Sequence, residues 1–325
     1  MTIVVTGGAG FIGSNFIFYQ LKHHKNDKII CIDKITYASD FSTIFPIIRN
    51  INFKFYKVDI CNKEKIFDIF KLEKPDVVIN FAAESHVDRS IKDPSQFLKT
   101  NVFGTYILLE ACRNFNVARF HQVSTDEVYG DLPKEEIELT FDEKCPIHSN
   151  NPYSCTKAAA DLLVLAYYRT YNLPISISRC TNNYGPYQNP EKLIPAVICN
   201  SIMNNKVYVH GDGTDVRDWI YVEDHCIAID LIIRKGKVGE IYNVGSHNEK
   251  KNIDVVKDII NILNKDFDII EYTKNRPGQD QRYAINSSKI QKQLKWSTKV
   301  GFEEGLKNTI NWYIENKNWW YNFLI

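Results

Sequence analysis

The chain has 325 residues, with 40 basic and 39 acidic side chains and a formal net charge of +1. The charges are scattered along the sequence, which argues against a nucleic-acid-binding or membrane-surface protein, because both need a basic stripe. A chain of this length can bury the core of one large α/β domain or of two lobes.

The eight cysteines are well separated and form no Cys-x-x-Cys pair. We expect reduced thiols rather than disulfides or a zinc site, and no bound metal. The N-terminus lacks the basic start of a signal peptide, and no apolar run approaches the roughly 18 residues of a membrane span. These features predict a cytoplasmic protein that does not enter a membrane.

Strand-like and helix-like segments alternate in the first half of the chain. Short runs rich in β-branched and aromatic residues are the expected strands, and they cover Thr2–Thr6, Lys28–Asp33, Asn52–Val58, Asp76–Asn80, Arg119–Val123 and Pro174–Cys180. Helical patterns lie between them, for example over Phe97–Phe115 and Ser154–Tyr171. The alternation predicts an α/β fold, a Rossmann-like doubly wound parallel sheet with helices on both faces.

The regular alternation of strand-like and helix-like segments ends at about Thr181. Turn-rich pieces such as "NNYGPYQNPEK" and "HGDGTDVRDW" separate shorter helices there. We therefore expect a dinucleotide-binding domain over residues 1–180 and a smaller, mainly substrate-binding lobe over residues 181–325, with an approximate boundary and room for segments to interleave.

The segment "TGGAGFIG" places three glycines between the first strand and the first helix, at Gly7, Gly10 and Gly13. Glycines there permit a tight turn, let the backbone approach a pyrophosphate and let the helix pack close to the sheet. The amino end of the helix adds N–H groups and a partial positive charge for the phosphates. A simple tight turn is the alternative interpretation.

Two aspartates strengthen the dinucleotide interpretation. Asp33 ends the second strand about 20 residues after the glycines, where a carboxylate can bind the hydroxyls of the adenosine ribose, and Asp59 follows the third strand. A carboxylate at residue 33 would repel a 2′-phosphate, so we expect NAD rather than NADP. The neighbouring Lys34 works against this preference.

"NPYSCTKAAA" contains Tyr153 and Lys157, which share one face of a helix because they are four residues apart. An ammonium near a phenol favours phenolate, so we expect Lys157 to lower the pKa of Tyr153. Such a tyrosine can take a proton from an alcohol while hydride leaves the same carbon. In a chain rich in Tyr and Lys this spacing also arises by chance.

"STDEVYG" (Ser124–Gly130) puts a hydroxyl and two carboxylates at the end of an expected buried strand. Ser124 and Glu127 fit a capping box, so the segment could simply start a helix. The other interpretation is a site that moves several protons. A turn into a helix is compatible with both, because adjacent residues of a straight strand point to opposite faces.

These motifs occur in the order of a known family. The set "TGGAGFIGSN", "FAAESHVDRSI", "STDEVYG", "YSCTK", "NNYGPYQNPEKLIP", "RDWIYVEDH" and "YAI" resembles the nucleotide-sugar branch of the extended short-chain dehydrogenases, and within it the dTDP-glucose 4,6-dehydratases. The resemblance runs from Thr2 to about Tyr313. It implies a homodimeric hydro-lyase with tightly bound NAD that converts dTDP-glucose, or alternatively UDP-glucose, into the 4-keto-6-deoxy sugar nucleotide.

The resemblance assigns the chemistry to five side chains. Tyr153, paired with Lys157, takes the proton of the 4-hydroxyl while hydride passes from carbon 4 to NAD, and Thr125 binds the oxygen at carbon 4. The ketone acidifies carbon 5, so Glu127 removes that proton while Asp126 protonates the leaving 6-hydroxyl, and hydride returns to carbon 6. Asp126 must therefore begin protonated and Glu127 ionised.

The resemblance also implies which residues hold the ligands. The expected NAD-binding residues are Gly7, Gly10, Phe11, Ile12, Gly13, Asp33, Lys34, Thr36, Asp59, Ile60, Ala82, Ala83, Ser85, Thr100, Tyr153, Lys157 and Asn183. The expected substrate-binding residues are Ser85, Thr125, Asn182, Lys192, Leu193, Tyr208, Arg217, Asn252, Arg276 and Gln279. Arg217 and Arg276 suit paired phosphates, because a guanidinium offers a planar fork of donors.

Four positions depart from the residues usual in the family. Gln279 stands where histidine is usual, Asn275 and Asn286 where aspartate is usual, and Thr181 where serine is usual. These positions lie near the nucleotide end, so they bear on the choice between thymine and uracil more than on the chemistry.

Two histidines in the motifs have no assigned chemical role. His86 either lies near the site or shapes its loop, and His225 is expected to be structural.

Two other functions fit part of the sequence. A sugar-nucleotide 4-epimerase or decarboxylase needs the NAD site but not the pair Asp126 and Glu127. A non-catalytic NAD-binding regulator needs none of the reactive set. The helices over Phe97–Phe115 and Ala158–Tyr171 are apolar over more than one face, which agrees with a homodimer.

Overall fold

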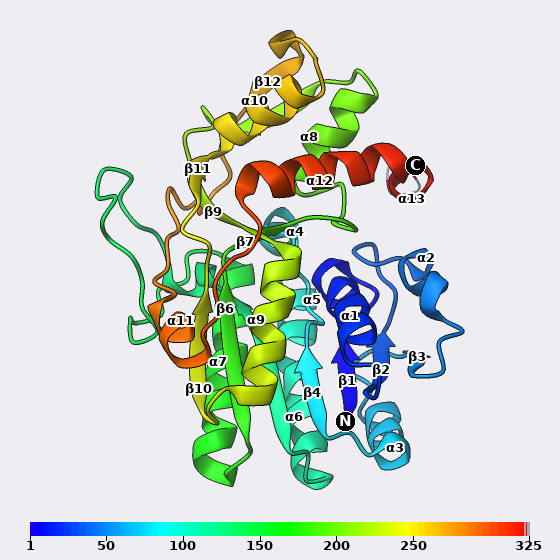
Figure 1. Ribbon diagram of the computed structural model, residues 1–325. Coiled ribbons are helices and arrows are strands. Elements are labelled where there is room, and N and C mark those ends of the chain that lie inside the picture. Colours follow the sequence, from blue (N-terminus) through cyan, green and yellow to red (C-terminus); the bar gives the residue numbers. More distant parts are fainter. Residues whose placement is uncertain (322, 324–325) are drawn as a thin grey trace.

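The computed structural model describes residues 1–321 and 323, and its largest element is a parallel sheet of seven strands (Figure 1). The strand order is β10-β6-β5-β4-β1-β2-β3, and every neighbouring pair is parallel. The strands are β1 (Thr2–Thr6), β2 (Lys28–Asp33), β3 (Phe53–Lys57), β4 (Val77–Asn80), β5 (Arg119–Thr125), β6 (Ile175–Cys180) and β10 (Glu240–Val244). The predicted fold class is confirmed, and β1 to β6 lie where the sequence predicts strands.

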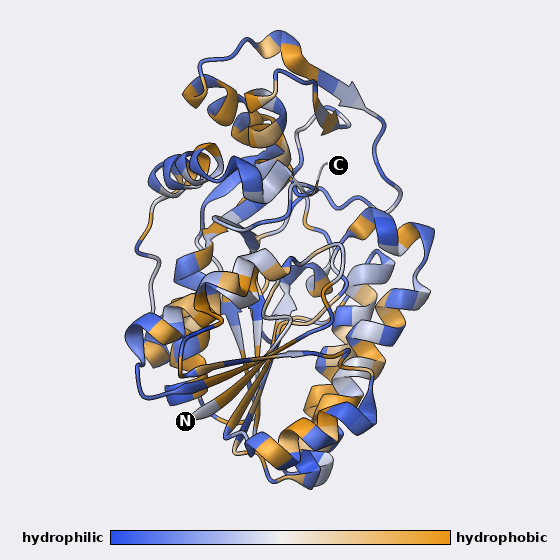
Figure 2. Cartoon of the chain, turned by 90° about the vertical axis from the view of Figure 1, so that its right-hand side faces the viewer, coloured by the Kyte–Doolittle hydropathy of each residue, from blue (hydrophilic) through white to orange (hydrophobic). Residues whose placement is uncertain are grey.

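Helices cover both faces of this sheet. One face carries α1 (Phe11–His23) and α9 (Val222–Lys235), and the other carries α3 (Lys63–Glu73), α6 (Thr105–Asn114) and α7 (Pro152–Tyr171). In β1, the side chains of Ile3 and Val5 belong to the core on the side of α1 and α9, whereas that of Val4 belongs to the core on the side of α3, α6 and α7. A continuous apolar run therefore serves both faces, because side chains alternate along a strand. Figure 2 shows the hydrophobic strands between the two helical layers.

Short elements connect the strands of the first half. They are α2 (Phe41–Ile44), η1 (Phe45–Ile47), α4 (Val87–Lys92), α5 (Ser95–Phe97), the π-helical η2 (Leu98–Gly104) and the 3-10 turn η3 (Asp126–Tyr129). The single helix expected over Phe97–Phe115 is thus divided by a widened turn. Such π-helical turns are frequent near functional sites. Within the described residues, no helix has the length and apolar character to cross a membrane.

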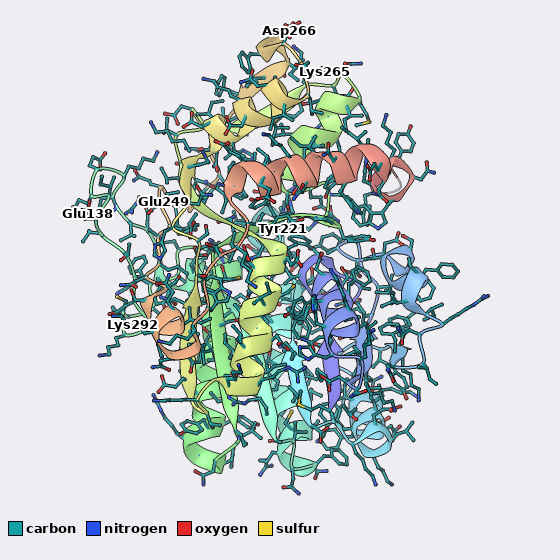
Figure 3. All side chains as sticks on the ribbon, viewed as in Figure 1. Glu138, Tyr221, Glu249, Lys265, Asp266 and Lys292 are labelled. Carbon is teal, nitrogen blue, oxygen red and sulfur yellow. The ribbon has the colours of Figure 1, made fainter. Side chains whose placement is uncertain are left out.

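The second half of the chain forms a smaller region above the sheet and then rejoins the sheet (Figure 1). The smaller region holds the sheets β11-β9-β7 and β12-β8. Its elements are β7 (Asn182–Tyr184), α8 (Leu193–Ile202), β8 (Val207–His210), β9 (Val216–Tyr221), β11 (Glu249–Lys251), α10 (Asn252–Ile262), η4 (Phe267–Ile269), β12 (Ile270–Thr273), α12 (Phe302–Glu315) and α13 (Lys317–Tyr321). Tyr221, labelled in Figure 3, joins β9 to α9, and from there the chain returns to place β10 beside β6; α11 (Ser288–Leu294) later packs against β10.

The chain order of the strands creates a crevice at one edge of the large sheet. The chain runs from β1 outward to β2 and β3, and then returns to β4 on the other side of β1. The connections that leave β1 and β4 therefore diverge at the carboxyl ends of these strands. In open parallel sheets this switch point is where ligands bind.

Candidate active site

The glycine turn after β1 lines the crevice with backbone, and its glycines pack closely against neighbouring backbone. Gly7 has a φ of +67°, and a Cβ atom added there would lie 2.7 Å from the backbone nitrogen of Ala82. A Cβ atom on Gly13 would lie 2.4 Å from the Gly7 carbonyl oxygen, so α1 packs against the turn as closely as its backbone allows. The amino end of α1 therefore opens directly into the crevice, where its N–H groups favour an anion.

Asp33 fastens the end of β2 to this turn. Its carboxylate accepts hydrogen bonds from the backbone nitrogens of Ala9 (3.0 Å) and Ile35 (2.8 Å). Burial raises the pKa of Asp33, and these two amide donors oppose that rise. The ammonium of Lys34 lies 3.6 Å from a Glu84 oxygen and 3.7 Å from an Asp59 oxygen, so two carboxylates offset its charge. This balance favours a ribose with free hydroxyls over one with a 2′-phosphate.

Every residue predicted to bind the cofactor lines a single cleft at the crevice. The cleft runs from the glycine turn, past Asp59 and Ile60, to Tyr153, Lys157 and Asn183. It also includes Thr100, which the widened turn of η2 carries. The residues present fit a dinucleotide, because a cradle without side chains faces the helix end and a buried carboxylate stands at the expected ribose position.

The strand β5 and the turn after it position the acidic pair. Thr125 is the last residue of β5, where it pairs with Cys180 of β6, and Asp126 begins η3. The Thr125 hydroxyl accepts a hydrogen bond from the Glu127 backbone nitrogen and donates one to an Asp126 oxygen, both at 3.3 Å. The capping box that Ser124 and Glu127 could have formed, one of the two interpretations of this segment, is not found, because the strand stays extended one residue further and Thr125 takes the capping position.

The two carboxyl groups differ in their surroundings. Asp126 is buried, and one of its oxygens has no hydrogen-bond partner among the described residues. Burial, together with the nearby Glu127, raises the pKa of Asp126 well above its usual range. Burial also raises the pKa of Glu127, but the positive charges of Arg217 and Lys192 oppose that rise. The site therefore favours a protonated Asp126 beside an ionised Glu127.

Tyr153 and Lys157 lie on the first turns of α7, which begins with an Asn151 cap on the Ser154 backbone nitrogen. The Lys157 ammonium donates a 2.6 Å hydrogen bond to the carbonyl oxygen of Val123. The expected lowering of the Tyr153 pKa is not found: burial, followed by the nearby Glu127, raises it well above its usual value. The reason is that the ammonium is engaged by the backbone of β5, while the phenol is enclosed beside a carboxylate.

A second cleft adjoins the first and extends toward the smaller region. It is lined by all the predicted substrate-binding residues except Thr125, which lines the first cleft. Ser85, Glu127, Asn182 and Lys192 line both clefts, so the two spaces meet at Glu127, while its neighbour Asp126 lines the first cleft alone. The Lys192 ammonium donates a 2.8 Å hydrogen bond to the Ser85 carbonyl oxygen, which ties the two walls together at this junction.

The arginines of the second cleft are held by other side chains and by backbone. The Arg217 guanidinium lies 4.4 Å above the Tyr283 ring and donates to the Asp280 carbonyl oxygen (2.8 Å). Arg276 donates to the side-chain oxygen of Gln279 (2.8 Å). The Gln279 amide in turn donates to a carboxylate of the loop before β9. A glutamine at residue 279 can therefore orient an arginine without carrying a charge itself.

Two histidines can now be placed. His86 lines both clefts, its Nε2 lies 3.3 Å from a Glu191 oxygen, and burial lowers its pKa. His225 is fully buried; its Nδ1 contacts the Asn183 side-chain oxygen at 2.9 Å, and burial lowers its pKa to about 3. His225 is therefore a neutral support for a residue of the cofactor cleft.

Sequence reasoning missed several residues that line the clefts: Tyr37, Glu84, Glu191, Asp280 and Tyr283. Glu84, Glu191 and Tyr283 fall within motifs that carry the family resemblance, so the motifs were a usable signal for these three. Tyr37 and Asp280 have no local pattern that distinguishes them, because their positions depend on contacts between distant loops.

The fold and the two joined clefts define a class of protein: a dinucleotide-dependent α/β enzyme whose reactive side chains lie between cofactor and substrate. The model of the family described as GDP-mannose 4,6 dehydratase matches residues 4–309. A dTDP-glucose 4,6-dehydratase of Escherichia coli is 46% identical, over 98% of this chain and 95% of its own length.

Two solved structures agree with that relationship. The Bacillus anthracis dTDP-glucose 4,6-dehydratase, in complex with NAD, has 46% identity and a TM-score of 0.93 over 99% of both chains. The Streptomyces venezuelae dTDP-glucose 4,6-dehydratase, also with NAD bound, has 39% identity and a TM-score of 0.95 over 99% of this chain and 100% of its own. This chain belongs to the dTDP-glucose 4,6-dehydratase family.

Proposed function

We propose that this chain catalyses the NAD-dependent conversion of dTDP-glucose into its 4-keto-6-deoxy derivative, with loss of one water. The single observation that supports this most is the adjacent pair Asp126 and Glu127, which lies where the cofactor and substrate clefts meet. Burial raises the pKa of Asp126 well above its usual range, whereas the positive charges of Arg217 and Lys192 oppose the rise that burial gives to the pKa of Glu127. An elimination of water needs one acid and one base in this relation.

The chain's own residues account for each proton. NAD, held by the residues that line the cofactor cleft, would supply the redox chemistry when bound, a reversible hydride transfer with the sugar. Tyr153 accepts the proton of the 4-hydroxyl in its phenolate form, which burial beside Glu127 disfavours in the free protein and which the positive charge of bound NAD would favour. Thr125 binds the oxygen at carbon 4. Glu127 removes the proton of carbon 5 while Asp126 donates a proton to the departing 6-hydroxyl, which leaves as water. Glu127 then returns its proton to carbon 5, and a proton transfer from Tyr153 to Asp126 through solvent restores the starting state.

The acidic pair separates this function from its closest alternative. A 4-epimerase or decarboxylase of the same fold needs the cofactor cleft, Tyr153 and Lys157, but no acid and base directed at carbons 5 and 6. A protein that only binds NAD needs none of the buried reactive groups. A buried carboxyl such as Asp126, with an oxygen that finds no partner in the part of the chain that the structure describes, is costly to keep unless it acts on a ligand.

The test is to incubate the purified chain with dTDP-glucose and measure the product by mass. We expect loss of one water, and substrate deuterated at carbon 4 should give product deuterated at carbon 6. An unchanged mass would indicate an epimerase, and net formation of free NADH would indicate an ordinary dehydrogenase. Either result would overturn the proposal.

The nucleotide is a finer part of the proposal. We infer that the substrate is dTDP-glucose rather than UDP-glucose. Of the four positions that differ from the residues usual in the family, Gln279 is the one that lines the substrate cleft. Its hydrogen bond to Arg276 preserves an oriented guanidinium for the diphosphate, so the substitution changes the surroundings of the nucleotide without removing its cationic partner. A panel of dTDP-glucose, UDP-glucose and UDP-N-acetylglucosamine, compared by kcat/KM, decides between them.

We further propose a homodimer in the cytoplasm. Three apolar side chains are exposed on η2 and α7: Leu98 (55%), Phe103 (48%) and Leu162 (57%). A symmetric helical interface would cover them. Leu162→Glu should shift the mass in solution from dimer to monomer, whereas Leu72→Glu on α3 should not, although Leu72 is even more exposed (67%). A monomeric wild type at micromolar concentration would refute the dimer. All eight cysteines are free thiols, which supports a reducing compartment.

A further inference from the structure

Three loops meet at the cofactor cleft, and each comes from a different part of the chain. They follow β2 (residues 34–40), β4 (residues 81–86) and β7 (residues 185–192). The Tyr37 hydroxyl of the first loop donates to a Glu84 oxygen of the second (2.9 Å). The Asn189 amide of the third donates to the Tyr37 carbonyl oxygen (3.0 Å). The first loop is thus fastened to both of the others.

Arg89, on α4, joins these loops from outside the cleft lining. Its Nε and one terminal nitrogen donate to the two Glu191 oxygens at 3.3 and 3.2 Å, so the contact is a two-pronged ion pair. The centre of the same guanidinium lies 3.7 Å from the centre of the Tyr37 ring. One side chain therefore connects the loop after β2, the segment that follows the loop after β4, and the loop after β7.

We propose that Arg89 is a clamp that slows the release of NAD from the cleft. Tyr37 and Glu191 both line the cofactor cleft, on loops that lie far apart in the sequence, and Arg89 holds them together. If NAD leaves between these loops, as the proposal requires, at least one Arg89 contact must open first. The inference rests on the proposed function, in which NAD is regenerated in every turnover, so slow release costs the enzyme nothing.

The type of contact sets the size of the effect. The Arg89 side chain is 48% exposed, so the core does not depend on it. Exposed ion pairs and exposed guanidinium–ring contacts are each weak, so we expect Arg89→Ala to release NAD about tenfold faster. Salt screens an exposed ion pair, so high salt should speed release from the wild type and have little effect on the variant.

Arg113 offers a matched control. It also makes a two-pronged ion pair, with Glu110 at 3.1 and 2.9 Å, and its guanidinium lies 4.7 Å from the centre of the Tyr171 ring. Its side chain is 47% exposed, but it lies on α6, away from the cleft. Arg113→Ala removes the same kinds of contact and should leave NAD release unchanged.

The experiment loads each purified full-length protein with NAD and measures the exchange of bound NAD for excess isotopically labelled NAD, at low and at high salt. Arg89→Lys keeps the charge but loses the planar fork, so its release rate should fall between those of the wild type and Arg89→Ala. Thermal unfolding of every variant verifies folding, and Arg89→Lys serves alone if Arg89→Ala does not fold.

Three results would overturn the clamp. They are equal exchange rates in wild type and the Arg89 variants, equal salt responses, and an Arg113→Ala variant that releases NAD as fast as Arg89→Ala. A wild type that binds no NAD at all would instead refute the assigned cofactor site, and with it the clamp. A wild type that holds NAD but forms no dehydrated product would refute the proposed reaction while the exchange comparison still decides on the clamp.

Discussion

The cofactor cleft and the substrate cleft are built in different ways. The cofactor cleft follows the carboxyl ends of neighbouring parallel strands, and at Gly7 its wall is bare backbone. The substrate cleft is lined by side chains from distant loops, such as Lys192, Arg217 and Gln279, each oriented by its own hydrogen bonds. The register of the sheet fixes the shape of the cofactor cleft, whereas the lining of the substrate cleft can change by substitution of one side chain at a time. The comparison indicates that the fold sets the cofactor, and a few side chains set the substrate.

The largest effect should come from Tyr153, which lines the cofactor cleft near its junction with the substrate cleft. Tyr153→Phe removes the only group assigned to accept the 4-hydroxyl proton, so turnover should fall about 10²- to 10⁴-fold. The measurement is product formation by mass, with unfolding temperature and NAD binding as controls that should stay near wild type. Turnover close to normal would show that Tyr153 is not the base.

The next effect divides the reaction at the acidic pair. In the double variant Asp126→Asn, Glu127→Gln, oxidation at carbon 4 remains possible but elimination lacks both acid and base. We expect product to fall about 10²-fold or more, while reduced cofactor accumulates on the protein and absorbs in the near ultraviolet. Loss of product without any reduced cofactor would mean that the pair also serves the first step, and the division of roles would be wrong.

The third prediction concerns a change in the cofactor cleft that leaves the side chains of the substrate cleft unaltered. Gly7→Ala places a Cβ atom 2.7 Å from the Ala82 backbone nitrogen at a φ of +67°, so the turn must shift. We expect a loss of about 2–5 kcal/mol in stability or NAD binding, from strain and overpacking together. Gly301→Ala is the control, because no atom of the described residues lies within 4 Å of an added Cβ atom there. Calorimetric titration with NAD measures the change in NAD binding, and chemical denaturation measures the change in stability. Equal results for the two variants would contradict this description of the turn.

The smallest effect is a pH dependence of stability. Burial raises the pKa of Asp126, so the folded protein keeps a proton that the unfolded chain releases at neutral pH. The stability from this group is fully present below the unfolded pKa of about 4 and is lost as pH rises toward the folded pKa. Asp126→Asn cannot ionise, so it should gain about 1 kcal/mol over wild type at pH 8 and less at pH 4.

Chemical denaturation at pH 4 and pH 8 measures this difference in stability. The exposed Asp212 is a control whose contribution to stability changes with pH in the opposite direction. Hydrogen bonds from the Thr214 side chain and backbone lower the pKa of Asp212, so its contribution is present at high pH and lost as pH falls. Asp212→Asn should therefore lose stability relative to wild type at pH 8. A variant Asp126→Asn with that same sign would show that residue 126 is ionised in the folded protein.

The parts of the fold that sequence predicted best are those specified by short, local patterns. The apolar runs of β1 and β2 have the predicted bounds, because a strand buried on both faces must be apolar along its whole length. The helix expected over Phe97–Phe115 was less accurate, since a packing contact between Gly104 and Ile60 accompanies a widened turn that no local pattern announces.

In the site too, local sequence patterns predicted some features, whereas others depend on packing. Tyr153 and Lys157 are found on one helical face as their spacing requires, yet the pKa of Tyr153 moves opposite to the expectation. Spacing along a helix determines which side chains are neighbours, but the electrostatic result depends on what encloses them. Here the carbonyl oxygen of Val123 engages the ammonium, and only the packing of α7 on β5 brings that atom within 2.6 Å.

By itself, the sequence determined the sheet class, the dinucleotide turn and the order of the reactive residues, because periodicity, glycine spacing and strand ends act over a few residues. Only the tertiary structure decided that one Asp126 oxygen has no partner among residues 1–321 and 323 while cations face Glu127, and that Arg89 bridges Tyr37 and Glu191. Burial and charge are sums over groups that lie far apart in the chain. They are therefore defined only after the loops have come together.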